Sequence, residues 1–108
     1  MESKIQSFRE LECWKACRQL RKFVAIDCVR SLPKEERYRL GDQLIRAARS
    51  TTANIAEGYG RFHYLDNAKF CSISRGSLNE VLDHLITAHD EGLISDQLLF
   101  AGEKHFEQ

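Results

Sequence analysis

The chain has 108 residues, of which 43% are hydrophobic and 30% are charged, as is ordinary for one domain, here residues 1–108, with a single core. No run of about 18 apolar residues predicts a membrane span, and the start lacks the apolar segment of an export signal, so we expect a cytoplasmic protein. The four cysteines, Cys13, Cys17, Cys28 and Cys71, lack the spacing of a disulfide framework and are expected to stay reduced.

The formal net charge is zero, but the charges are unevenly distributed along the chain. Residues 1–61 carry 13 Lys and Arg against 8 Asp and Glu, whereas residues 62–108 carry 3 against 8. A basic half and an acidic half favour polyanion binding or head-to-tail self-association. They are equally compatible with two solvated faces of opposite bias.

The first predicted helix runs from Ser7 to about Arg30. Ser7 and Glu10 fit a capping box, in which each side chain bonds a free amide at the start of the helix. Apolar residues recur behind this cap at spacings of three and four, which is typical of an amphipathic helix. The apolar positions are Leu11, Trp14, Cys17, Leu20, Val24 and Cys28.

A second helix is expected after Pro33, the only proline. It is expected to end at Gly58 and Gly60, because glycine accepts the left-handed conformation that helix ends favour. Its predicted buried positions are Leu40, Leu44, Ala47, Ala48, Thr51 and Ile55.

A third helix is expected from about Leu65 to Glu91, with Gly92 as its stop, and Ser95 is expected to cap a fourth. The apolar positions of the third are Phe70, Ile73, Leu78, Val81, Leu82, Leu85, Ile86 and Ala88, and those of the fourth are Leu98, Leu99 and Phe106. No segment alternates as a half-buried strand does. The pattern therefore predicts an all-α domain, an antiparallel up-down four-helix bundle with a short fourth helix.

Small residues on the second and third helices predict close helix packing. The face opposite the buried stripe of the second helix is predicted to carry Arg46, Arg49, Ser50, Ala53 and Glu57. The small residues of that face would let another backbone approach, from the same chain or from a second copy. Asn54 lies at the edge of the stripe, either covered and hydrogen-bonded or half-exposed. Gly76, inside the third helix, is predicted to admit the small face of the second.

The run from Asn54 to Arg61, Asn-Ile-Ala-Glu-Gly-Tyr-Gly-Arg, follows Gln43 and Arg46-Ala47-Ala48. It resembles the signature of the four-helix-bundle protein family, also known as the proteins encoded by intervening sequences in bacterial large-subunit ribosomal RNA genes. Two further segments agree in order: Phe8 to Leu11 with Trp14 and Ala16, and Gly76 to Glu80. The resemblance covers nearly the whole chain.

The resemblance implies an antiparallel four-helix protomer that assembles into a ring-like homopentamer. A distant relative, the accessory protein of diversity-generating retroelements, is a pentameric barrel that binds nucleic acid and a reverse transcriptase. This chain lacks the strongly basic character of that relative, and its last helix, shorter than is usual in the family, is expected to leave part of the bundle uncovered. The residues assigned to packing or subunit contacts are Ser50, Ala53, Asn54, Glu57, Gly58, Gly60, Gly76, Ser77 and Glu80.

The residues that could carry catalysis favour no active site. Two histidines of the third helix are five residues apart, too far round a helix to share one metal ion. Cys13 and Cys17 have a metal-compatible spacing, but without a second ligand pair they are interpreted as small buried hydrophobes. Glu57 and Glu80 would form a carboxylate pair only if their helices align, and a structural role is more common. We therefore expect no enzyme, no cofactor and no metal.

Basic residues on the first two helices are the candidates for nucleic-acid contacts. They are Arg18, Arg21, Lys22, Arg46, Arg49 and Arg61. Contacts from such residues to phosphates give affinity without base specificity, and a ring would repeat them. Helices also carry basic residues for solubility and ion pairs. The leading expectation is a non-enzymatic homo-oligomer that binds RNA or DNA, and the alternative is a structural or protein-interaction module.

Overall fold

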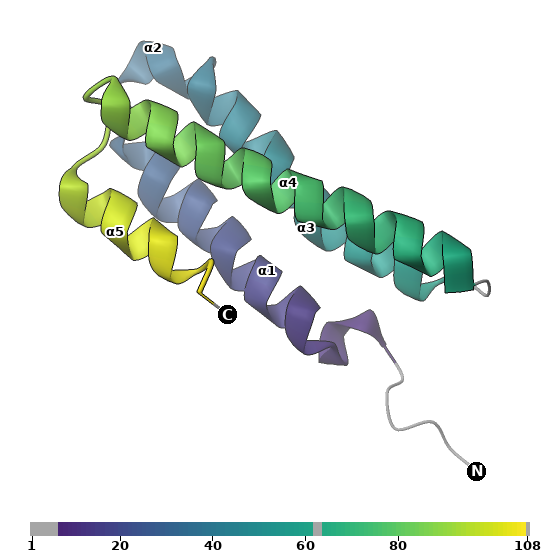
Figure 1. Ribbon diagram of the computed structural model, residues 1–108. Helices are drawn as coiled ribbons and strands as arrows, with labels where there is room; N and C mark the ends of the chain where they lie inside the picture. Colours follow the sequence, from purple (N-terminus) through teal and green to yellow (C-terminus); the bar gives the residue numbers. More distant parts are fainter. Residues whose placement is uncertain (1–6, 62–63, 108) are drawn as a thin grey trace.

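The computed structural model describes residues 7–61 and 64–107, and every element within them is helical. The elements are η1 (Phe8–Glu10), α1 (Glu12–Phe23), η2 (Val24–Cys28), η3 (Val29–Ser31), α2 (Lys34–Arg37), α3 (Leu40–Tyr59), α4 (Tyr64–Asp90) and α5 (Asp96–Lys104). Figure 1 shows α1, α3, α4 and α5 running alternately in opposite directions along one long axis. The prediction of an all-α up-down four-helix bundle is confirmed.

The first predicted helix is shorter than expected, because separate helical turns precede and follow it. Ser7 Oγ accepts a hydrogen bond from the Arg9 amide at 3.2 Å and so caps the 3₁₀ turn η1. α1 begins only after Leu11, whose backbone is extended (φ −72°, ψ 131°). After Phe23 the chain continues as the π-helical turn η2 and the 3₁₀ turn η3. The predicted cap at Ser7 therefore starts one short turn, and the single helix predicted to Arg30 is divided.

The second predicted helix is two helices, α2 and α3. Pro33 precedes α2, and Arg39 (φ −112°, ψ −92°) breaks the helical backbone between them. Arg37 of α2 donates hydrogen bonds to the carbonyl oxygens of Leu32 at 3.2 Å and Arg30 at 3.0 Å. These bonds satisfy carbonyl groups that the end of the preceding helical segment leaves without partners.

The core lies where α1, η2, α3 and α4 meet, with α5 covering one end. The largest fully buried apolar side chains are Leu20, Val24, Leu32, Leu44, Val81 and Leu85. Most predicted apolar positions are buried or packed against this core. Ile73 and Ile86, by contrast, are exposed, with exposed fractions of 42% and 41%.

Polar residues fill the contact between α3 and α4. The hydroxyl oxygens of Ser50 and Ser77 lie 2.8 Å apart, and the Ser74 hydroxyl donates to the Thr51 carbonyl oxygen at 2.9 Å. The Asn54 amide donates to the Ser50 carbonyl and hydroxyl oxygens at 2.8 and 2.9 Å. Asn54 is thus half-buried with its partners within its own helix. Ser50 was predicted on the face opposite the buried stripe, where small residues admit another backbone from the same chain or a second copy. That backbone is α4 of the same chain, because α3 packs against α4 as well as α1 and its buried arc is wide.

Gly58, and not Gly76, is the glycine at which α3 and α4 approach most closely. A Cβ atom on Gly58 would lie 2.8 Å from Asn67 Oδ1 and 3.0 Å from Phe70 Cβ. A Cβ atom on Gly76 would meet nothing within 4 Å. The prediction that Gly76 admits the second helix is therefore wrong within the protomer, because its neighbour Ser77 faces α3 and Gly76 faces outward.

The three glycines predicted at helix ends differ in their backbone geometry. Gly92 has φ 74°, the left-handed conformation expected of a residue that ends a helix, and α4 ends two residues before it. Gly60 follows α3 with φ −78°, so the expectation of a left-handed turn there is wrong. Gly58 lies inside α3 and contributes a close approach instead of a turn.

The short α5 leaves one part of the bundle uncovered, as predicted. Ser95 Oγ accepts a hydrogen bond from the Leu98 amide at 3.0 Å, which confirms the predicted cap. Past the end of α5, an open and mostly apolar groove of about 400 Å³ lies between α1 and α4. The residues lining this α1–α4 groove include Cys13, Ala16, Leu20, Leu78, Leu82 and Phe106.

Candidate nucleic-acid interface

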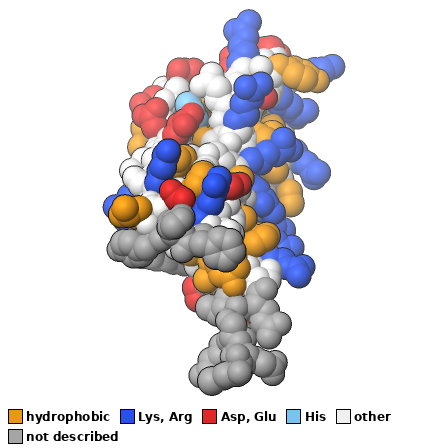
Figure 2. Space-filling model, turned by 90° about the vertical axis from the view of Figure 1, so that its right-hand side faces the viewer, with side chains coloured by type: hydrophobic (Ala, Val, Ile, Leu, Met, Phe, Trp, Pro, Cys, Tyr) orange, Lys and Arg blue, Asp and Glu red, His pale blue; other side chains and the backbone are white. Residues whose placement is uncertain are grey.

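Most basic side chains lie on one side of the folded chain, and many acidic side chains lie on another. Figure 2 shows Lys and Arg gathered along one edge of the molecule and many Asp and Glu on the upper part of the opposite edge. This arrangement follows from the sequence, because the basic half forms α1, α2 and α3 and the acidic half forms α4 and α5. Exposed cations on α1 and α3 include Arg18, Lys22 and Arg49.

Arg21 links α1 to α3. Its Nη1 donates to Thr52 Oγ1 at 2.7 Å, and Thr52 Oγ1 in turn lies 3.3 Å from the Arg49 carbonyl oxygen. The bond restrains the half-buried Arg21 side chain and brings it within one helical turn of Arg49. A guanidinium group has five N–H donors, so Arg21 keeps donors free for phosphate oxygens.

Two of the six predicted nucleic-acid contacts already have carboxylate partners. Arg46 Nε lies 3.0 Å from Asp42 Oδ2, and Arg61 Nη2 lies 2.8 Å from Glu57 Oε2. Arg61 also lies over the Phe70 ring, 5.0 Å from its centroid, and so links the end of α3 to α4. Within residues 7–61 and 64–107, no ion pair includes the four remaining candidates. We call these four the basic face: Arg18, Arg21, Lys22 and Arg49.

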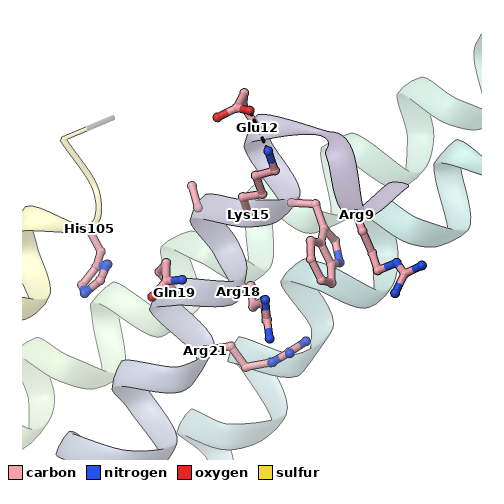
Figure 3. A pocket seen from close by; sticks show the side chains of 9 residues that line it. Arg9, Glu12, Lys15, Arg18, Gln19, Arg21 and His105 are labelled. Carbon is pink, nitrogen blue, oxygen red and sulfur yellow. Dashed lines mark hydrogen bonds and ion pairs between the residues drawn. The ribbon is translucent and has the colours of Figure 1, made fainter. Parts of the chain in front are cut away.

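An open depression of about 810 Å³, here called the α1 depression, lies on the outer side of α1. Its basic lining residues are Arg9, Lys15, Arg18 and Arg21. Glu12 is the carboxylate among its lining residues, and its Oε2 lies 3.2 Å from Lys15 Nζ. Figure 3 shows Arg18 and Arg21 extending from the same side of α1, toward α3. Two residues of the basic face therefore form one wall of the depression.

Trp14 also lines the α1 depression, although its spacing in the sequence indicates only the apolar stripe. Its indole is half-buried and meets the Phe8 ring at a centroid distance of 5.3 Å and an interplanar angle of 68°. The guanidinium carbon of Arg18 lies 5.9 Å from the indole centroid, near the outer limit of about 6 Å for a cation–π contact. Sequence reasoning missed Trp14 as a site residue. The available signal was Arg18 four residues later, on the same helical face.

The residues predicted for packing or subunit contacts divide into two groups. The α3–α4 contact includes Ser50, Gly58 and Ser77, and Asn54 bonds Ser50 within α3. The exposed group consists of Ala53, Glu57, Gly60, Gly76 and Glu80. For the exposed group, contact with another copy stays a prediction.

Glu57 and Glu80 do not meet as a carboxylate pair. The contact between Ser50 and Ser77 sets the register of the antiparallel helices, and it places the two carboxylates about ten residues, or ~15 Å, apart along α4. Glu80 Oε2 lies instead 3.2 Å from His84 Nε2. Among the described residues, no three His, Cys, Asp or Glu side chains are grouped to hold a metal ion. No described helix has the length and hydrophobicity needed to cross a membrane.

The cysteine pair Cys13 and Cys17 is divided between surface and core. Cys17 is buried, which raises the pKa of its thiol, and a hydrogen bond with Thr51 partly opposes that shift. Cys28 is also buried, and burial raises its pKa to about 12. Cys13 is exposed, so the prediction that it is buried is wrong. Cys13 lines the α1–α4 groove, which α5 does not reach.

Comparison with known protein families gives a match over nearly the whole chain. The model of the family described as 23S rRNA-intervening sequence protein matches residues 9–108, which include every helix from α1 to α5. No match is found among curated proteins. The family match confirms the resemblance that the segment from Asn54 to Arg61 carries.

Proposed function

The chain belongs to the family of 23S rRNA-intervening sequence proteins, and from that premise we propose that it is a non-enzymatic homo-oligomer that binds RNA or DNA through its basic face. The observation that carries this proposal is the basic face itself, four cations from two helices that form no ion pair within the described residues. The oligomer is the ring-like pentamer that the sequence resemblance implies.

The basic face suits a phosphate backbone better than base edges. Arg21 is held in place by Thr52, so less side-chain freedom is lost when it binds a phosphate. Its planar donors match phosphate oxygens, as do those of Arg18 and Arg49. Contacts of this kind give affinity that depends on salt and not on sequence. In a pentamer the face is repeated five times, which raises the avidity for a long chain.

Apolar surface on the protomer supports self-association. The α1–α4 groove is open, and Ile73 and Phe100 are 42% and 59% exposed. Apolar surface of this kind marks interfaces when it is contiguous and rimmed by polar residues. In a ring, one surface of each protomer contacts a different surface of the next protomer. The α1–α4 groove supplies apolar area for one such surface, and the exposed apolar side chains of neighbouring helices supply it for the other.

A structural or protein-interaction module is the second candidate, and the α1–α4 groove favours it. The groove is lined by apolar residues of α1 and α4 and by Phe106, which follows α5. An amphipathic helix of another protein would lay its apolar side into such a groove. Binding of that kind would respond weakly to salt, whereas phosphate binding would not.

Fluorescence anisotropy of a labelled structured RNA at about 50 and 200 mM salt tests the nucleic-acid proposal. Four phosphate contacts predict that affinity falls by about 50-fold (single-stranded segments) to about 150-fold (duplex segments) between these concentrations, because each contact releases counterions. The variant Arg18→Glu with Arg49→Glu should lose binding. The matched control, Lys69→Glu with Lys104→Glu, makes the same change in net charge on α4 and α5 and should bind more tightly than the first variant.

Equal loss of binding in both variants would show that net charge, and not the basic face, determines affinity. No binding at the lower salt concentration would overturn nucleic-acid binding and leave the interaction module as the function. Light scattering of the same samples gives the mass of the assembly. A monomer at micromolar concentration would contradict the oligomer independently of the RNA result.

A further inference from the structure

The α1 depression combines one aromatic ring with four basic side chains, and we infer that it binds single-stranded nucleic acid by stacking a base on Trp14. This inference rests on the proposed function and names its ligand more closely. Sequence-tolerant single-strand sites pair a positively charged path for the backbone with aromatic rings on which bases stack. The depression supplies both within one open volume of about 810 Å³.

The indole of Trp14 has no ring stacked flat on it among the described residues. The Phe8 ring is inclined by 68° to it, so that contact is edge to face. The Arg18 guanidinium carbon is 5.9 Å from the indole centroid, farther than a side chain in close stacking contact. The indole is therefore held by Phe8, partly exposed, and adjacent to a cation that can bind the phosphate of a stacked nucleotide.

The charges around Trp14 direct a nucleic-acid backbone past the ring. Arg18 and Arg21 belong to both the α1 depression and the basic face, and Arg9 extends the row of cations beyond α1. Lys15 Nζ lies 3.2 Å from Glu12 Oε2, so this pair adds little net charge. Arg9, Arg18 and Arg21 are the cations that remain for phosphates. A strand that follows these cations crosses Trp14, where a flexible single strand can turn one base onto the indole. A duplex keeps its bases stacked on each other and cannot do so.

Trp14 is the only tryptophan in the chain, so its fluorescence reports on this site without any mutation. The unmodified protein is titrated with an oligouridylate of about ten nucleotides, with a duplex RNA of the same length and with inorganic polyphosphate. Anisotropy of labelled RNA gives affinity in parallel. Base stacking predicts saturable quenching by oligouridylate at the concentration at which it binds, and little quenching by the duplex or by polyphosphate.

Each of the other outcomes of this titration would overturn a different part of the proposal. Oligouridylate binding without quenching would overturn the stacking site and leave nucleic-acid binding intact. Equal quenching by polyphosphate would show that the indole senses charge alone, which also overturns stacking. Absence of binding by every probe would overturn the proposed function, and the stacking site with it.

Two substitutions at Trp14 distinguish the loss of base stacking from the loss of the fold. Trp14→Leu should weaken oligouridylate binding by at least about fivefold, and Trp14→Phe, which keeps a ring, should retain most of it. Both variants should bind duplex RNA as the unmodified protein does. Circular dichroism confirms that each variant is folded, and if Trp14→Leu fails to fold, the quenching experiment decides alone. Equal oligouridylate affinity of a folded Trp14→Leu variant would overturn the inference.

Discussion

Two helix glycines with opposite surroundings give the sharpest test of how α3 and α4 pack. In Gly58→Ala, the new Cβ atom would lie 2.8 Å from Asn67 Oδ1 and 3.0 Å from Phe70 Cβ. The amide oxygen can rotate away, but the Phe70 Cβ atom is attached to the backbone of α4, so the two helices must separate slightly. In Gly76→Ala, the new atom meets nothing within 4 Å.

The two substitutions are therefore expected to change the free energy of unfolding in opposite directions. Replacing glycine by alanine inside an exposed helix stabilises it by about 1 kcal/mol, and Gly76→Ala should gain that amount. Overpacking costs about 1–3 kcal/mol, and at Gly58, close to the end of α3, the helix gain is smaller. Gly58→Ala should thus destabilise the protein by about 1–2 kcal/mol, which separates the variants by about 2–3 kcal/mol.

Urea unfolding followed by circular dichroism measures this difference. All samples must have one protomer concentration, because the stability of an oligomer depends on concentration. Light scattering must accompany each curve, since a change of mass in Gly76→Ala would place Gly76 in a subunit contact. If Gly76→Ala has an unchanged mass and destabilises the protein as much as Gly58→Ala does, the packing argument is refuted.

Three further predictions concern the interior. The hydroxyl oxygens of Ser50 and Ser77 lie 2.8 Å apart, so alanine at either position should lower the free energy of unfolding by about 1 kcal/mol. A double-mutant cycle should show a coupling energy of at least ~0.5 kcal/mol. Additive losses of stability would exclude a hydrogen bond between the two. Burial raises the pKa of Cys28 from 9.0 to about 12. Between those values the unfolded thiol loses its proton and the folded one keeps it, so stability falls as pH rises, and Cys28→Ala should reduce that slope by up to about 1.4 kcal/mol per pH unit; an unchanged slope would contradict the burial. A thiol reagent near pH 8 should label Cys13 and Cys71 in the folded protein and the buried cysteines only in urea; rapid labelling of all four would disprove the assigned burial.

The helical frame was predictable because its signals are local. Pro33, Gly92 and Ser95 act through their own backbone and side-chain bonding, so each could be assigned a boundary without knowledge of its neighbours. The spacing of the apolar residues then gives the buried face of each helix. The break at Arg39 has no comparable local signal, and it divides a segment that the spacing alone joins.

The α3–α4 contact was not predictable, because its polar residues form hydrogen bonds with residues far away in the sequence. Ser74 is buried since its hydroxyl bonds the Thr51 carbonyl oxygen, a partner 23 residues away in the sequence. Reading hydrophobicity alone places Ile73 inward instead of Ser74. The sequence assigns Ser50 and Ser77 to packing or subunit contacts, but only the structure shows that they face each other.

The candidate site likewise has features that the sequence predicts and features that it does not. Arg46 and Asp42, like Arg61 and Glu57, have the i, i+4 spacing of ion pairs in helices. The sequence alone could therefore have predicted that these two arginines are paired and are weaker candidates for the site. The bond from Arg21 to Thr52 joins residues 31 apart and could not be inferred from spacing.

The zero net charge of the chain does not oppose binding of a polyanion at the basic face. The molecule measures 53 × 20 × 20 Å between its Cα extremes, whereas the screening length at physiological salt is about 8 Å. A phosphate at the basic face therefore interacts with the nearby cations, and the carboxylates across the bundle are largely screened. At 0.01 M salt the screening length is about 30 Å, which exceeds the width of the bundle, so the acidic helices then oppose binding. Net charge is thus a poor guide for a protein whose opposite charges are segregated to two edges, and the binding proposed here depends on the basic face at physiological salt.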